Sequence, residues 1–220
     1  MPLALSSHPA RLSGVISWGL IVPVKRLELA KTRLTGFTPS ARADLALAFA
    51  ADVVCAVLAC PLVQHVLVVT DDERAAAALA ALGAEVVGDR PDSGLNPALA
   101  HGAALVRERD AQCGVATASS DLASLRPQDL AVVLAALSPG GRGFVGDMAG
   151  TGTTVLGAAP GADLAPSFGP GSWRRHSDSG AMELTAPQTV HLDVDTPDDL
   201  VLAMALGVGT HTRGVLRDLR

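Results

Sequence analysis

The sequence lacks the features that mark a secreted, membrane-spanning or zinc-binding protein. It has three cysteines in 220 residues, Cys55, Cys60 and Cys113, and no Cys-x-x-Cys spacing. An odd number without that spacing is typical of a reducing compartment and predicts no zinc site. No apolar run near the N-terminus is long enough for a signal peptide, and the longer apolar runs are alanine-rich and contain Asp or Arg. We therefore expect a cytoplasmic protein with no membrane span.

Positive charge and the common nucleotide motifs are also scarce. The formal net charge is -5, which argues against a nucleic acid partner because phosphate backbones need a basic surface. A mononucleotide is not excluded, since it needs only a few local cations. The sequence contains no Gly-x-Gly-x-x-Gly and no Walker motif. Their absence weighs against a dinucleotide oxidoreductase and against a P-loop enzyme.

Strand-like and helical patterns alternate along the chain, and 49% of the residues are apolar. Strands are expected at 15–24, 65–69, 84–87, 114–118, 144–145, 153–156 and 189–194. Helices are expected after Thr38, after Asp72, before Val106, after Pro127 and after Thr196. Continuous apolar strands separated by helices predict an α/β fold, with a mostly parallel central sheet and helices on both faces.

No internal repeat or linker divides the chain. We expect residues 1–14 to form an N-terminal tail and residues 15–210 to form a single domain. Within this domain, residues 139–188 are rich in Gly and Pro. Because loops carry function, this segment is expected to be a substrate-binding lobe.

Four cations follow the first predicted strand: Lys25, Arg26, Lys31 and Arg33. In an open α/β sheet, ligands bind at the carboxyl ends of the strands. Arg can bind phosphate with two donors and Lys acts as a point charge, so this loop could neutralise a triphosphate. A solvated basic loop is the alternative, because charge runs are usually surface.

Carboxylates follow two later strand patterns. Asp121 comes after the run at 114–118, and Asp193 and Asp195 close the run at 189–194. Residues two apart in an extended strand point the same way, so this pair could present two carboxylates together. Three carboxylates suit Mg²⁺, which also binds phosphate oxygens. The alternatives are a chance pair and a capping turn before the last helix.

Two segments, 150–154 and 168–172, are rich in glycine, which lets backbone N–H groups approach an anion closely. Thr153 and Ser172 would add hydroxyl donors, and Ser172 could begin a short helix. Ordinary turns are the alternative. Arg174, Arg175 and His176 follow, and they could sense substrate charge or form a solvated helix face.

Together these segments resemble one family, the 2-phospho-L-lactate guanylyltransferases of coenzyme F-420 biosynthesis, which include phosphoenolpyruvate guanylyltransferases. Seven segments occur in the family's order: 22–27 with 30–34, 68–72, 94–98, 120–122, 150–153, 168–172 and 192–197. The resemblance covers about Gly19 to Gly207.

The resemblance implies a three-layer nucleotidyltransferase fold, similar to the glycosyltransferase type A fold. It implies that a phosphorylated acid attacks the α-phosphorus of GTP, with Mg²⁺ as cofactor and pyrophosphate as leaving group. The alanine-rich composition resembles actinobacterial members, whose acceptor is phosphoenolpyruvate. The product would be enolpyruvoyl-2-diphospho-5'-guanosine, available for transfer to the next enzyme of the pathway. 2-Phospho-L-lactate is the alternative acceptor.

The resemblance also assigns roles to residues at matching positions. Thr153, Gly169 and Ser172 would bind the acid; Asp121, Asp193 and Asp195 the metal; Lys25, Lys31, Arg33 and Asn96 the nucleotide. Asp121 and Lys25 would be catalytic. One departure is present: where the family commonly has Gly-Asp-Leu-Pro or Ala-Asp-Leu-Pro, this chain has Ser-Asp-Leu-Ala, ending at Ala123. The loop after Asp121 therefore lacks a stiffening proline.

Two further alternatives remain at this point. One is a sugar-phosphate or molybdopterin nucleotidyltransferase on the same fold. The other is a non-catalytic nucleotide-binding protein, against which the retained carboxylates argue.

Overall fold

The computed structural model describes residues 16–137 and 139–219, so the expected tail at 1–14 lies outside the described residues. A seven-stranded sheet forms the centre of the molecule, in the order β3-β2-β1-β4-β6-β5-β7. The strands are β1 (Trp18–Pro23), β2 (Val63–Val69), β3 (Glu85–Val87), β4 (Gly114–Ala118), β5 (Arg142–Gly146), β6 (Thr153–Ala158) and β7 (Met182–Glu183).

The sheet is mostly parallel, as predicted. β1 pairs in parallel with β2 and β4, β2 with β3, and β5 with β7. β6 alone is reversed and runs antiparallel to β4 and β5. Its first residue, Thr153, therefore lies at the same edge of the sheet as the carboxyl ends of β4 and β5. The segment 139–188 thus contributes β5, β6 and β7 to the sheet.

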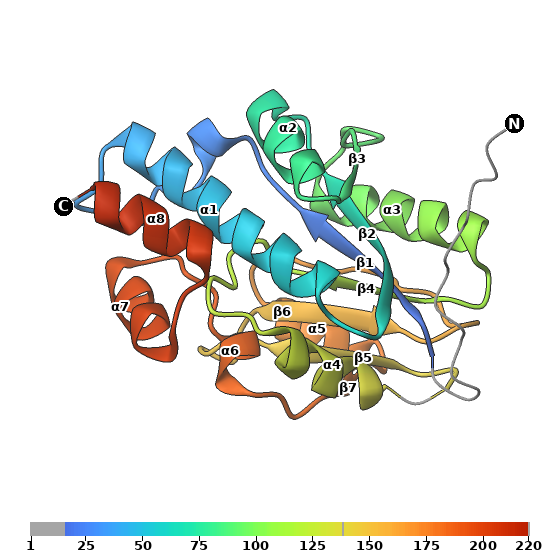
Figure 1. Ribbon diagram of the computed structural model, residues 1–220. Coiled ribbons are helices and arrows are strands. Elements are labelled where there is room, and N and C mark those ends of the chain that lie inside the picture. Colours follow the sequence, from blue (N-terminus) through green and yellow to red (C-terminus); the bar gives the residue numbers. More distant parts are fainter. Residues whose placement is uncertain (1–15, 138, 220) are drawn as a thin grey trace, which may run out of the picture.

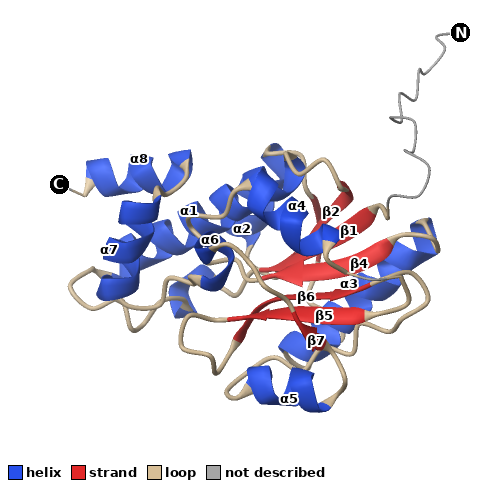
Figure 2. Cartoon of the chain, turned by 90° about the horizontal axis from the view of Figure 1, so that it is seen from below, coloured by secondary structure: helices blue, strands red, loops and turns tan. Residues whose placement is uncertain are grey.

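Helices cover both faces of the sheet, which confirms the α/β prediction (Figures 1 and 2). They are α1 (Pro39–Leu58), α2 (Glu73–Ala81), α3 (Leu95–Arg109), α4 (Pro127–Ala135), α5 (Ser172–Asp178), α6 (Gln188–His191), α7 (Pro197–Leu206) and α8 (Thr210–Asp218), with a 3-10 turn, η1, at Leu27–Leu29. One buried cluster joins β1 and β2 to α1, α2 and α4. A second joins the other face to α3 and to Trp173 of α5.

Local sequence signals explain where several helices begin. The Thr38 hydroxyl accepts a hydrogen bond from the Ala41 N–H at the start of α1, where Pro39 occupies the first turn. The start of α7 has a capping box between Thr196 and Asp199. Within the described part of the chain, no helix has the length and apolar character needed to cross a membrane.

One prediction near the C-terminus is wrong, and one helix there was not predicted. The strand expected at 189–194 is wrong: residues 188–191 form α6, and 192–195 belong to no strand. The short β7 pairs with β5 at that edge instead. The helix α8 was not predicted. It packs along α1 (Figure 1), and the buried Asp52 carboxylate of α1 accepts from the N–H groups of His211 and Thr212. Tertiary contacts therefore stabilise this polar, Gly-containing segment.

Candidate functional site

Two adjoining cavities open where the carboxyl ends of β1 and β4 meet the start of β6. The first, of about 360 Å³, lies between the loops after β1 and β4. The second, of about 570 Å³, lies between the loops at 147–153, 168–172 and 193–199. Arg33, Leu95 and Asp195 line both cavities, so the two share one edge. A pair of ligands bound in them would meet at that edge.

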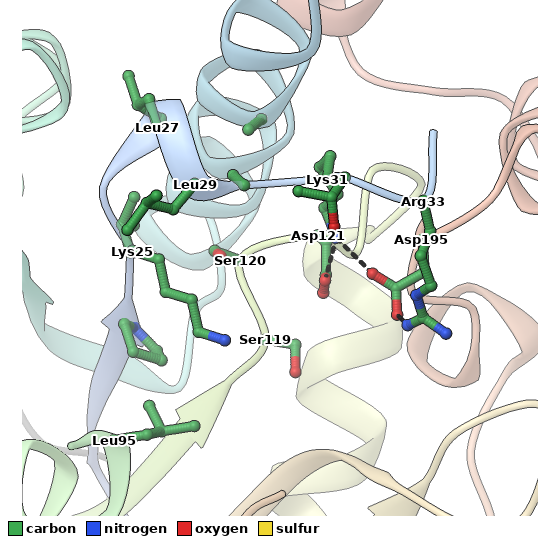
Figure 3. Close-up of a pocket in the computed structure, with 15 residues that line it drawn as sticks. Lys25, Leu27, Leu29, Lys31, Arg33, Leu95, Ser119, Ser120, Asp121 and Asp195 are labelled. Carbon is green, nitrogen blue, oxygen red and sulfur yellow. Dashed lines mark hydrogen bonds and ion pairs between the residues drawn. The ribbon is translucent and has the colours of Figure 1, made fainter. Parts of the chain in front are cut away.

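Oppositely charged groups meet in the first cavity (Figure 3). The Lys31 Nζ lies 2.5 Å from Asp121 Oδ2 and 3.0 Å from Asp195 Oδ1. The Arg33 guanidinium pairs with the other oxygen of Asp195. Residues predicted as nucleotide and metal contacts are thus brought together from three distant segments.

Charge pairing sets the ionisation of this cluster. Burial lowers the pKa of Lys31, but Asp121 and Asp195 outweigh it and hold the pKa above its ordinary value. Burial raises the pKa of Asp195, yet Lys31, Arg33 and Lys25 bring the net pKa below the ordinary value. Lys31 and Asp195 therefore stay charged at neutral pH.

Asp193 has the opposite environment. Burial, followed by repulsion from Asp121 and Asp195, raises its pKa to about 7. Asp193 lines the second cavity and takes part in no ion pair within the described residues. Asp193 is thus a carboxyl group of the site that no cation of the described residues pairs with.

The donor set fits a divalent cation. The Asp121 Oδ1 is buried and has no hydrogen-bond partner among the described residues. An unpartnered carboxylate oxygen, together with the Asp193 carboxyl group that forms no ion pair, is a suitable ligand for a hard cation such as Mg²⁺. The three carboxylates are not gathered into a closed set, because the Lys31 ammonium lies between Asp121 and Asp195.

One group of three acidic residues in the described segments does have ligand oxygens within 4.8 Å of one another. It consists of Asp71, Asp89 and Asp92, in the loops that follow β2 and β3. These residues are exposed or half-buried and do not line the two cavities.

A third apolar cluster holds the charged residues in place. Its buried members include Leu34, Phe49, Ala123, Leu192, Val194 and Leu200. Charged residues of the site lie within three positions of one of them: Lys31, Arg33, Asp121, Asp193 and Asp195. Leu192 and Val194 are buried while Asp193 and Asp195 are not, so the predicted alternation holds although the ladder is absent. Burial of the apolar neighbours therefore fixes where the carboxylates emerge.

Hydrogen bonds hold the loop that lacks the family's proline. The Ala123 N–H donates to the Asp121 carbonyl at 2.9 Å, and the Val194 N–H donates to the same oxygen at 3.0 Å. The Gly209 N–H donates to the Ala123 carbonyl. Proline has no N–H and could not make the first of these bonds. Backbone hydrogen bonds therefore hold the loop that carries Asp121, where the family's proline ring would otherwise stiffen it.

The remaining predicted nucleotide contacts, Lys25 and Asn96, lie in different surroundings. Lys25 is exposed, lines the first cavity and extends toward Ser119 (Figure 3). Asn96 is not among the lining residues of either cavity. Its side chain accepts from the Phe168 N–H and donates to the Phe168 carbonyl. Asn96 therefore holds a wall of the second cavity, and its nucleotide contact stays a prediction.

The two glycine-rich segments of the second cavity differ. The N–H groups of Thr151 and Gly152 donate to the Asp147 carboxylate, so this turn is closed on itself. In the other segment, Gly169 has a φ of +116°, a conformation that glycine tolerates best. Its N–H forms no hydrogen bond within the part of the chain that the structure describes. The segment at 168–172 is thus the one that keeps a backbone donor for an anion.

Hydroxyl groups from the two segments meet behind this loop. The Ser172 Oγ donates to the Thr153 Oγ1 at 3.2 Å, and both residues are buried. The His176 Nδ1 lies 2.9 Å from the same Thr153 oxygen. His176 is fully buried, so the interpretation of it as a solvated helix face is wrong. Its spacing of four from Ser172 places both on one side of α5 and was the available signal.

The neighbouring arginines serve the loop and the surface. Arg175 donates to the carbonyls of Ser167 and Pro170, which clamps the loop at 168–172 from outside. Arg174 is exposed and pairs with Asp178 at 3.5 Å. In this structure neither arginine lines the second cavity.

Comparison with known proteins gives a consistent family. A family model described as "Guanylyl transferase CofC like" matches residues 19–220. The phosphoenolpyruvate guanylyltransferase of Streptomyces coelicolor is 54% identical over 203 residues, covering 91% of this chain and 96% of that protein. The enzyme of the same name from Thermomonospora curvata is 50% identical over 209 residues, covering 94% of this chain and 90% of that protein.

Solved structures agree on the fold. CMP:2-keto-3-deoxy-manno-octonic acid synthetase, solved with CTP, superimposes with a TM-score of 0.53 over 86% of this chain and 98% of its own. Its sequence identity is 16%, so the likeness concerns the fold alone. The fold is thus that of nucleotidyltransferases, as expected from the sequence.

Proposed function

Because the chain belongs to the CofC-like guanylyl transferase family, we propose that it transfers GMP from GTP to phosphoenolpyruvate. The products are enolpyruvoyl-2-diphospho-5'-guanosine and pyrophosphate. One structural observation carries the proposal: a charged cavity and a cavity with neutral donors share an edge at Arg33 and Asp195. A nucleotide and a small anionic acceptor can meet there.

The first cavity suits the triphosphate. Lys25, Lys31 and Arg33 supply three cations from the loop after β1. A phosphate oxygen of the acceptor attacks the α-phosphorus, a new phosphorus–oxygen bond forms, and pyrophosphate leaves with the electrons of the broken bond. Such a reaction asks a protein mainly for positioning and charge neutralisation. Lys25 neutralises the reacting phosphates, which is the catalytic role proposed for it.

Asp121, Asp193 and Asp195 would hold Mg²⁺, in keeping with the unpartnered Asp121 Oδ1 and with the raised pKa of Asp193, which a bound cation would lower. When bound, the ion supplies neutralisation of the charge on the phosphate oxygens. Lys31 would then exchange its carboxylate partners for phosphate oxygens. Asp121 and Asp195 would each gain the metal ion as they lose Lys31, so neither carboxylate would be left without a cation.

The second cavity suits phosphoenolpyruvate. This acceptor carries a phosphate and a carboxylate on three carbons, and each anion removed from water must be matched by hydrogen bonds. The Gly169 N–H and the Thr153 hydroxyl lie at this cavity and add no net charge. Ser172 supports the Thr153 hydroxyl from behind. The reaction would belong to coenzyme F-420 biosynthesis in the cytoplasm, with the product passed to the next enzyme of the pathway.

A product scan by mass spectrometry tests the proposal. Each of the four ribonucleoside triphosphates is incubated with phosphoenolpyruvate, 2-phospho-L-lactate and a sugar phosphate in the presence of Mg²⁺. We expect the guanylylated enolpyruvate product as the dominant species. Dominant turnover of 2-phospho-L-lactate would change the acceptor, and turnover of CTP with a sugar phosphate would overturn the assignment. Binding of a nucleotide without turnover in every combination would support the alternative of a non-catalytic nucleotide-binding protein.

A further inference from the structure

His176 lies directly behind the second cavity, in a fully buried position on α5. Its Nε2 accepts a hydrogen bond from the Ser167 N–H at 2.9 Å, and its Nδ1 lies 2.9 Å from Thr153 Oγ1. The rings of Phe144 and Phe168 pack against the imidazole, with centroid distances of 5.8 and 5.1 Å. The ring is therefore held in one orientation by two polar and two aromatic contacts.

The Ser167 contact fixes the tautomer. A backbone N–H can only donate, so the Nε2 that receives it carries no proton. A neutral imidazole then has its proton on Nδ1 and donates to the Thr153 oxygen. Burial, with smaller contributions from Arg142 and Arg175, lowers the pKa of His176 to about 4, so the ring is neutral at physiological pH.

The Thr153 oxygen receives a second hydrogen bond, from Ser172 Oγ at 3.2 Å. A hydroxyl has two acceptor positions and one proton. With both acceptor positions filled from behind, Thr153 has only its proton left to offer. Thr153 lines the second cavity, so a ligand there can receive that proton.

We propose that His176 is a positioning residue for the acceptor: with Ser172, it makes the Thr153 hydroxyl an obligatory donor toward the cavity. A donor of this kind favours a group that only accepts, such as a carboxylate or phosphate oxygen, over a hydroxyl that also needs an acceptor. The identity of the acceptor rests on the proposed function, whereas the tautomer and the hydrogen-bond direction belong to the ligand-free chain.

Two substitutions distinguish the contact made by Nδ1 from the contact made by Nε2. In His176→Asn, the side-chain amide lies near the place of Nδ1 and can donate to Thr153. In His176→Gln, the amide reaches the place of Nε2, where its oxygen can accept from Ser167, and the donor to Thr153 is lost. We expect Gln to raise KM for phosphoenolpyruvate by about tenfold, the usual cost of one hydrogen bond to a charged group, with KM for GTP unchanged. Asn should restore KM for phosphoenolpyruvate to within about threefold of the wild-type value.

A double-mutant cycle with Thr153→Val distinguishes positioning from general support of the fold. Valine removes the hydroxyl that His176 orients, so His176→Gln should then add little to the loss in acceptor KM. Additive losses, or equal losses in the Asn and Gln variants, would overturn the proposal. If the Gln variant does not fold, a loss above threefold in a folded Asn variant has the same consequence.

A measurement without substrate keeps the proposal separate from the assigned reaction. In NMR spectra of the ligand-free chain labelled with nitrogen-15 histidine, His176 is identified by its absence from the His176→Asn spectrum. We expect the neutral tautomer with the proton on Nδ1 at pH 7. A proton on Nε2 would contradict the positioning role even if phosphoenolpyruvate is the acceptor. The expected tautomer in a chain that does not transfer GMP would instead refute only the proposed function.

Discussion

The two cavities offer different kinds of groups for binding anions. The first presents cations, and Lys31 and Arg33 are paired with carboxylates of the same site. The second has charged residues along the shared edge, but away from that edge it presents neutral donors that other protein groups hold in place, as His176 and Ser172 do for Thr153. Charged partners can be exchanged for those of a ligand, whereas the neutral donors are set before a ligand arrives. The difference suits a triphosphate that brings a metal on one side and a small rigid acid on the other.

Loss of a carboxylate in the charged cavity should have the largest effect. Asp121→Asn keeps the shape but removes the charge of the carboxylate whose unpartnered oxygen would hold Mg²⁺. We expect turnover to fall by at least the roughly 10- to 100-fold typical of groups that only support a metal ligand. Steady-state kinetics with circular dichroism as a folding check measure it, and the exposed Asp163→Asn serves as control.

The same cavity can be tested by chelation. Activity should disappear in excess chelator and return with added Mg²⁺. Full activity in chelator would contradict the proposed requirement for Mg²⁺. Lys31 would then remain the partner of Asp121 during the reaction.

A smaller effect is expected for the neutral donors of the second cavity. Thr153→Val keeps the shape and removes one donor, so acceptor binding should weaken by about five- to a hundredfold, or about 1–3 kcal/mol. KM for GTP should change little. The control is Thr185→Val, because the Thr185 side chain is exposed and lines neither cavity. A change in the GTP constant alone would mean that Thr153 was assigned to the wrong ligand.

The basic loop should show the reverse pattern. Lys31→Ala should weaken GTP binding by roughly tenfold, and Arg33→Ala by less, because the Arg33 side chain is 69% exposed and its charge is screened by water. Calorimetry with GTP and Mg²⁺ measures both, with Arg26→Ala as the control from the same loop that does not line the cavity. Unchanged affinity for GTP in both variants would favour the alternative interpretation, that this loop is a solvated surface with no role in nucleotide binding.

The smallest effect concerns stability and pH. The pKa of Asp193 is raised to about 7, so the folded chain binds more protons than the unfolded chain between about pH 4 and 7. Stability is therefore lost as the pH rises through this window. Asp193→Asn should be more stable than the wild type at pH 8 by on the order of 1 kcal/mol, after allowance for solvent screening, and equal to it near pH 4. Denaturant unfolding at both pH values checks this, and a difference independent of pH would contradict the assigned cause.

The sequence predicts the sheet and most helices because their signals are local. Apolar runs mark the strands, and Thr or Asp before Pro or Glu marks the helix starts at 39, 73 and 197. The charged cavity was also predictable, since Lys31 and Asp121 follow strands whose carboxyl ends share an edge. The extended segment at 192–195 was misread as a strand because its alternation reflects burial against α1 and α7, and strand order is not encoded locally.

The neutral donors of the second cavity were only partly predictable. Thr153 and Ser172 stand in recognisable glycine-rich segments, but the burial of His176 depends on Phe144 and Phe168, which come from other elements. The helix α8 was missed for the same reason, since Asp52 and the surface of α1 supply what its own sequence lacks. In both cases the decisive contacts join residues distant in the chain.

The most direct test of the two-cavity account is a crystal structure with Mg²⁺, a non-hydrolysable GTP analogue and phosphoenolpyruvate. The account predicts the triphosphate against Lys25, Lys31 and Arg33, with Lys31 released from Asp121. It predicts an anionic oxygen of the acceptor within hydrogen-bond distance of Thr153 Oγ1, on the side away from His176. A triphosphate bound between Thr153 and Gly169, or an acceptor among the lysines, would contradict it.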